Sequence, residues 1–123
     1  MKLIEKLSND LFVYQPGNCT RYMILARKIE PCHWDPDADL AIFWLKHGDR
    51  GGVGMVLPSS GGSQLHLSYF CEKTGIGEAD AVALLCFLGE QFGVKVSGIP
   101  IAYRREAWFQ QAEARGANCL VTA

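Results

Sequence analysis

The sequence lacks the features of a membrane-spanning, exported or disordered chain. No apolar run approaches the roughly 18 residues that a spanning helix needs, and residues 1–6 are not followed by the apolar core of a leader peptide. Hydrophobic residues make up 49% of the chain, charged residues 20%, and the formal net charge is -1, which disfavours disorder. We therefore expect a cytoplasmic protein that does not associate with membranes.

The cysteines also lack the spacing of a disulfide framework. There are 5 of them in 123 residues, an odd and scattered set with no Cys-x-x-Cys pair, at positions 19, 32, 71, 86 and 119. A chain of this length buries enough apolar surface to fold without covalent staples. We therefore expect reduced thiols in a single domain that spans residues 1–123.

Familiar catalytic and metal-binding motifs are missing as well. The chain has no Gly-x-Ser-x-Gly elbow, His-Glu-x-x-His helix or phosphate-binding loop. Asp35, Asp37 and Asp39 alternate like the first ligands of a calcium loop, but Leu40 stands where that loop needs glycine and Lys46 where it needs glutamate. We expect no metal and no cofactor. Enzymatic activity stays uncertain, and the sequence favours its absence.

The first half of the chain carries strand signals. An apolar run at Leu11–Tyr14 and a longer run at Thr20–Ile29 flank the turn residues 15–18, which predicts a hairpin. The apolar run Leu40–Leu45 fits either a buried strand or a buried helix. Because glycines and the strand-like segment Val53–Leu57 follow it, we favour a second hairpin.

The second half carries helix signals. Residues 78–92 show a wide apolar stripe with acidic residues in the first turn and Gly93 at the end, which predicts a helix. A further helix is predicted over Tyr103–Arg115, before Gly116. Residues 94–96 and 119–121 indicate short strands, the second at a sheet edge. Periodicity leaves open whether residues 65–73 form a helix or a strand.

These elements predict an α+β fold. We expect a mostly antiparallel sheet from the N-terminal half, with two or three helices from the C-terminal half packed on one face. The runs beginning at Thr20 and Leu40 carry apolar residues on both faces, so the second face needs a cover of its own. A homodimer through the free face or edge of the sheet would supply that cover.

Residues 67–88 resemble a helix-turn-helix motif. Gly75 stands at the turn, Cys71 is a small residue four positions earlier, and Ile76, Ala81 and Leu84 occupy apolar support positions. The same glycines resemble the phosphate-holding hairpin of helix-hairpin-helix proteins. The charges contradict both resemblances, because residues 74–94 contain no Lys, Arg or His and carry several acidic side chains. Nucleic-acid binding is therefore disfavoured.

The strongest candidate binding surface combines aromatic and cationic side chains. Such side chains are enriched at protein interfaces, and here they are Arg21, Tyr22, Arg27 and Trp34. We expect a non-catalytic binding or regulatory module, homodimeric, whose partner is a protein or a small molecule. One alternative is a nucleic-acid-associated regulator that uses residues 67–88. Another is a small enzyme with Cys19 as nucleophile, because a turn position beside Arg21 can lower a thiol pKa.

Overall fold

The computed structural model describes residues 3–15, 22–28, 40–46, 52–57 and 64–122. The chain divides into two compact units, Met1–Leu57 and Pro58–Ala123. The expected α+β class is confirmed, with an antiparallel sheet in the first unit and three α-helices in the second. Among the helices of the described residues, none has both the length and the apolar character required to span a bilayer.

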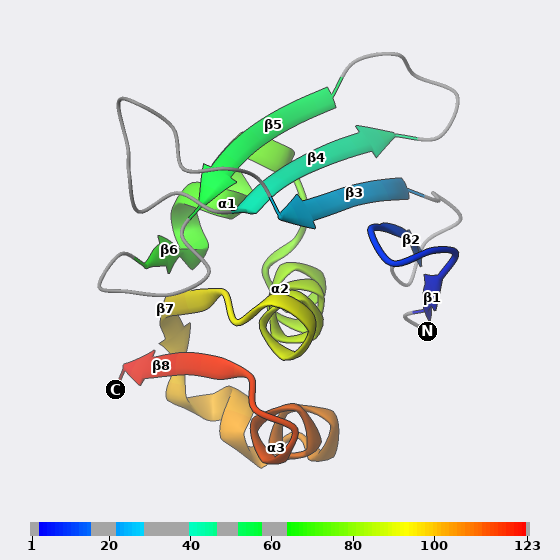
Figure 1. The fold of residues 1–123 in the computed structure, drawn as a ribbon. Helices are drawn as coiled ribbons and strands as arrows, with labels where there is room; N and C mark the ends of the chain where they lie inside the picture. The colour runs from blue at the N-terminus through cyan, green and yellow to red at the C-terminus, as the bar shows by residue number, and fades with distance from the viewer. Residues whose placement is uncertain (1–2, 16–21, 29–39, 47–51, 58–63, 123) are drawn as a thin grey trace. The chain divides into compact units, whose positions relative to one another are not determined.

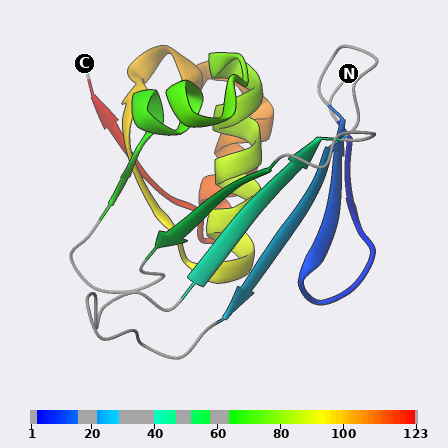
Figure 2. The same ribbon diagram turned by 90° about the horizontal axis from the view of Figure 1, so that it is seen from above.

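The first unit contains a five-stranded antiparallel sheet whose strands lie side by side in chain order (Figures 1 and 2). Both predicted hairpins are confirmed, and β4 is a strand because it pairs with β3 on one side and β5 on the other. The strands are β1 (Leu3–Lys6), β2 (Leu11–Gln15), β3 (Tyr22–Lys28), β4 (Leu40–Lys46) and β5 (Gly52–Leu57).

Described side chains on one face of β2, β3 and β4 are buried. Phe12 lies opposite Ile24, and Ala26 lies opposite Ile42, so these side chains share a face. All four are at most 1% exposed. On the other face of β3, Met23 is 39% exposed. The two-sided apolar character of this strand therefore corresponds to one buried face and one partly exposed face.

The second unit contains a three-stranded parallel sheet in the order β6-β7-β8. A parallel sheet was not predicted, so the expectation of a mostly antiparallel sheet describes the first unit only. Parallel neighbours need long crossover connections, and helices supply them here. The elements are β6 (Leu65–His66), α1 (Leu67–Thr74), α2 (Glu78–Phe92), β7 (Lys95–Pro100), the 3₁₀ helix η1 (Ile101–Arg105), α3 (Ala107–Ala114) and β8 (Asn118–Thr122).

The segment whose structure the sequence left open changes from strand to helix at His66. Leu65 and His66 pair with β7, and α1 begins at the next residue. His66 keeps an extended backbone and caps the helix by accepting a hydrogen bond from the Ser68 amide at 3.2 Å. The segment 65–73 therefore contains both a short strand and a helix, one after the other.

The long helix α2 spans the predicted residues 78–92 and ends at Gly93, whose φ of 74° is the left-handed conformation that glycine tolerates. Its buried positions cover an arc of about 200° at 100° per residue, much wider than a simple stripe: Ala81, Val82, Leu84, Leu85, Cys86, Leu88 and Gly89. The helix is therefore mainly a core element of its unit.

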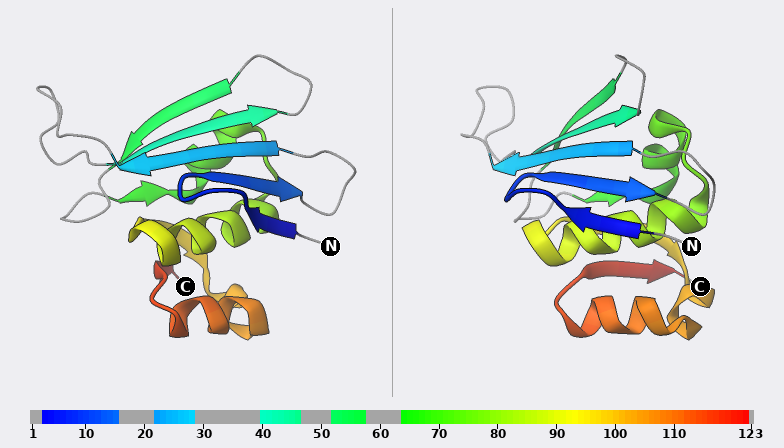
Figure 3. Two further views of the ribbon diagram at one scale, coloured as in Figure 1. Left: turned by 45° about the vertical axis from the view of Figure 1, so that its right-hand side comes forward. Right: turned by 90° about the vertical axis from the view of Figure 1, so that its right-hand side faces the viewer.

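The last predicted helix begins later than expected. Tyr103–Arg105 belong to η1, and Glu106 interrupts the helix with an extended backbone at φ -80° and ψ 130° before α3 begins at Ala107. The ring of Trp108 then meets Tyr103 edge to face at 6.2 Å. After Gly116, with φ 106°, the chain turns back into the predicted edge strand β8 (Figure 3).

Candidate functional site

The structure describes only part of the surface predicted from sequence. Arg21 and Trp34 lie outside the described residues, as does the candidate nucleophile Cys19. Tyr22 is half-buried at the start of β3, and Arg27 is exposed near its end. The two positions differ by five in sequence, an odd number, so they lie on opposite faces of the strand. The two described members of the predicted surface are therefore not brought together.

Arg27 already has a partner. Its Nε lies 3.6 Å from Asp10 Oδ2, and both side chains are largely exposed. Such surface ion pairs contribute little to stability. The pair does, however, place the guanidinium beside Asp10, the residue that precedes β2.

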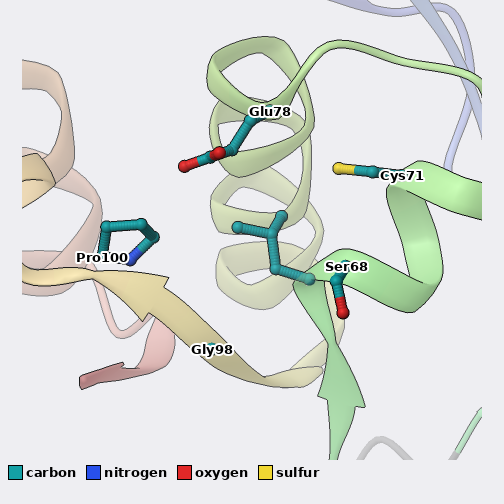
Figure 4. Close-up of a pocket in the computed structure, with 6 residues that line it drawn as sticks. Ser68, Cys71, Glu78, Gly98 and Pro100 are labelled. Carbon is teal, nitrogen blue, oxygen red and sulfur yellow. The ribbon is translucent and has the colours of Figure 1, made fainter.

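A pocket of about 270 Å³ in the second unit is a site that the sequence did not indicate. Its lining comes from the start and the middle of α1, the first residue of α2, and β7. The lining residues are Leu67, Ser68, Cys71, Glu78, Gly98 and Pro100. Figure 4 shows the Cys71 sulfur directed toward α2 and the Glu78 carboxylate directed toward the side of the pocket where Pro100 lies.

The local structure explains why these residues meet. Leu67 and Cys71 are four residues apart on α1, so they present one face of the helix. Gly75, with φ 73°, ends α1 and allows the chain to turn, so that Glu78 follows at the start of α2. His66 pairs with Ser97 on the neighbouring strand, which brings Gly98 beside the beginning of α1.

Gly98 makes this close approach to α1 possible. It has a φ of 78° and lies in an irregular stretch of the β7–β8 pairing. A Cβ at this position would lie 2.6 Å from both Cε1 and Nε2 of His66. The absence of a side chain therefore leaves room for the imidazole ring, which lies directly over the glycine.

The imidazole of His66 is hydrogen-bonded to Ser68. Ser68 Oγ lies 2.8 Å from His66 Nδ1, the same atom that accepts from the Ser68 amide. Because Nδ1 accepts from the amide, the serine hydroxyl acts as donor to it. Figure 4 shows the Ser68 hydroxyl directed away from Glu78 and Cys71. Its role is therefore local, at the start of the helix.

Glu78 is the one acidic side chain among the lining residues, and it has a partner on η1. Tyr103 lies close enough to Glu78 for the phenol to interact with the carboxylate. Burial raises the pKa of Tyr103, and the nearby carboxylate of Glu78 raises it further. The phenol therefore stays protonated at neutral pH.

Cys71 is a poorly activated thiol. Burial raises its pKa above the ordinary value of 9.0, and the charge of Glu78 adds to that effect. Cys71 and Cys86 are both free thiols. Because the thiolate is the nucleophilic form, Cys71 is less reactive at neutral pH than an unperturbed cysteine.

The pocket combines apolar walls with one carboxylate, a neutral thiol and a hydroxyl that points elsewhere. This set suits binding through shape and one charged contact better than covalent chemistry. Within the described ranges, no group of three or more His, Cys, Asp or Glu side chains is placed to hold a metal ion.

Residues 67–88 do form two helices joined by a tight turn at Gly75. The exposed positions of α2 are Glu78, Ala79 and Gln91, which offer a phosphate backbone no positive charge. A nucleic-acid role for this segment stays a prediction from the motif alone.

Several pocket residues belong to sequence patterns that indicate other roles. Cys71 was considered as a small packing residue, and Glu78 as a first-turn acid of the helix. Gly98 is the one position with a usable signal, because a glycine inside a strand pattern indicates a bulge or a close backbone approach. The pairing of β6 with β7, which assembles the pocket, has no short-range signal in the sequence. No protein-family model, curated protein or solved structure matches this chain.

Proposed function

We propose that this protein is a non-catalytic binding module that holds a small molecule in the pocket between α1, α2 and β7. The observation that carries the proposal is the pocket itself, about 270 Å³ in volume, with apolar walls and a carboxylate beside Tyr103. Known ligand sites are mostly apolar cavities of roughly 300–1,000 Å³ with a few fixed polar groups. This pocket is slightly smaller than that range, which suits a small ligand.

The orientation of Ser68 and the raised pKa of Cys71 support binding without catalysis in this pocket. Ser68 donates to His66 and points away from Glu78 and Cys71 (Figure 4). The thiol of Cys71 has a raised pKa, whereas catalytic cysteines have lowered ones. The Cys71 thiol is therefore not activated, and the Ser68 hydroxyl, although it is paired with a histidine as activated serines are, is not directed at a molecule in the pocket.

We further propose that the module works as a homodimer in the cytoplasm. Met23 is 39% exposed and Leu25 is half-buried on the same face of β3, which supports a contact between two copies through that sheet face. The free thiols of Cys71 and Cys86 are consistent with a reducing compartment.

Native mass spectrometry of protein purified gently from cells tests the binding proposal. We expect a reproducible additional mass on the intact protein, and its loss in Cys71→Phe, because the larger side chain fills the pocket. Glu72→Phe is the matched control, since Glu72 is an exposed residue on the same helix that does not line the pocket. An additional mass that survives Cys71→Phe would show that the ligand binds elsewhere.

A further inference from the structure

The pocket carries a negative charge and no positive one among its lining residues. Glu78 is the only charged residue among its described lining residues, and the rest are apolar or neutral. Asp80 lies in the same first turn of α2, and the charges of Glu78 and Asp80 both raise the pKa of Tyr103, so these two carboxylates set a negative field around that phenol. An anionic ligand would meet like charge here without a compensating cation from the lining.

Two cations of this unit, Lys73 and Arg115, are engaged with other partners. Lys73 Nζ lies 5.7 Å from the ring centroid of Tyr69, on the exposed side of α1. Arg115 Nη1 lies 3.7 Å from Glu90 Oε1 at the other end of α2. These two positive charges therefore do not neutralise Glu78.

The carboxylate of Glu78 has capacity for further donors. Tyr103 is the neighbour that interacts with it, whereas an ionised carboxylate can accept about four hydrogen bonds. A ligand ammonium or guanidinium group would supply the further donors together with the opposite charge. Leu67 and Pro100 add apolar wall to the same pocket, which suits a short hydrocarbon chain attached to that group.

We infer that the pocket selects a small organic cation, in which a short apolar chain carries an ammonium or guanidinium group that pairs with Glu78. This inference rests on the proposed function, since it names the class of ligand for the same pocket. The Tyr103 hydroxyl lies beside the carboxylate, and the apolar lining receives the chain. Free lysine-like or arginine-like metabolites with a carboxylate near the chain end would be disfavoured by the same negative field.

Three probes with the same four-carbon chain and different charge test the inference: n-butylammonium, n-butanol and n-butyrate. Each is titrated into the ¹⁵N-labelled full chain, and amide chemical-shift changes are followed at Cys71, Glu78 and Gly98. We expect n-butylammonium to bind most tightly and n-butyrate most weakly. The preference for the cation should shrink with added salt, because the charge pair is solvent-accessible.

Glu78→Gln removes the charge and keeps the size of the side chain. We expect it to weaken n-butylammonium binding about two- to fivefold, the effect of an accessible charge pair, and to leave n-butanol binding unchanged. Glu72→Gln makes the same change in net charge on the exposed surface of α1 and should affect neither probe.

The outcomes separate the ligand class from the function. Equal binding of all three probes, a preference for n-butyrate, or an unchanged n-butylammonium affinity in Glu78→Gln would overturn the cation inference while leaving a functioning pocket. Shifts at Cys71, Glu78 and Gly98 that Cys71→Phe abolishes would identify that pocket directly. The absence of shifts with every probe, together with no additional mass on the native protein, would overturn both proposals.

Discussion

Replacing Gly98 with alanine is a direct test of how the pocket is held together. The native φ of 78° costs a residue with a side chain about 1–2 kcal/mol, and the new Cβ would lie 2.6 Å from two atoms of the His66 ring. Moving the exposed ring releases its hydrogen bonds with Ser68, at about 0.5–1.5 kcal/mol. Alanine also restricts the unfolded chain, which offsets about 0.4–1 kcal/mol. We expect a net loss of roughly 2 kcal/mol.

Gly75→Ala is the matched control for backbone strain. Gly75 has a similar φ of 73°, but a Cβ there meets nothing within 4 Å. The same strain and the same unfolded-state gain apply, so we expect a loss of roughly 1 kcal/mol or less. The difference between the two variants measures the cost of displacing His66.

Urea denaturation followed by circular dichroism measures both variants, with an unchanged m-value as the check that the unfolding transition is comparable. His66→Ala provides a second test, because removing the ring should make Gly98→Ala as mild as Gly75→Ala. If Gly98→Ala is no more destabilising than Gly75→Ala, or keeps its full cost without the His66 ring, the proposed stacking of imidazole on glycine is wrong.

Three further predictions concern single side chains of the second unit. Cys71 should react with a maleimide at neutral pH more slowly than free cysteine, because burial and Glu78 raise its pKa. Glu78→Gln should accelerate the reaction of Cys71. Peptide mapping by mass spectrometry measures these rates, and a Cys71 rate equal to that of free cysteine would contradict the raised pKa. The pKa of Tyr103 is raised above 10.0 in the folded chain, so its contribution to stability is fully present below that ordinary value and is lost as pH rises through the folded pKa. Tyr103→Phe should therefore lose less stability than the native chain between neutral and strongly alkaline pH, and parallel pH dependences of the two unfolding free energies would refute this. Arg115→Ala should lower the unfolding free energy by less than about 1 kcal/mol, because the Arg115 side chain is 66% exposed beside Glu90. Phe109→Ala, at a fully buried position, should lower it by about 3–5 kcal/mol. Denaturant unfolding ranks the two variants, and a larger loss of stability for Arg115→Ala would contradict this ranking.

Sequence patterns predicted the elements well where the determining interactions are local. Residues 78–92 were identified because the stripe, the acidic first turn and Gly93 lie within the helix itself. The first hairpin was visible because its turn joins two adjacent apolar runs. Residues 65–73 could not be resolved, because the change from strand to helix at His66 depends on pairing with β7, far along the chain.

The pocket was not predicted from the sequence, because it also depends on pairing between distant segments. Cys71 and Glu78 are close in sequence, but Gly98 reaches them only through the parallel pairing of β6 with β7. The late start of α3 depends on Glu106, whose extended backbone breaks a segment that local propensity reads as continuous helix. The predicted aromatic and cationic surface was drawn from residue type alone, and strand alternation separates Tyr22 from Arg27.

The strand order of the first unit has a consequence for how the chain folds. Each of its strands pairs with the strand that follows it in sequence, so the sheet can grow one hairpin at a time by closing short loops. In the second unit, Leu65 pairs with Val96 across α1 and α2, and Lys95 pairs with Asn118 across η1 and α3. Because pairing across long separations is slow, ordering of the antiparallel sheet should precede ordering of the parallel one. The pocket, which depends on that later pairing, would then be among the last features of the native structure to form.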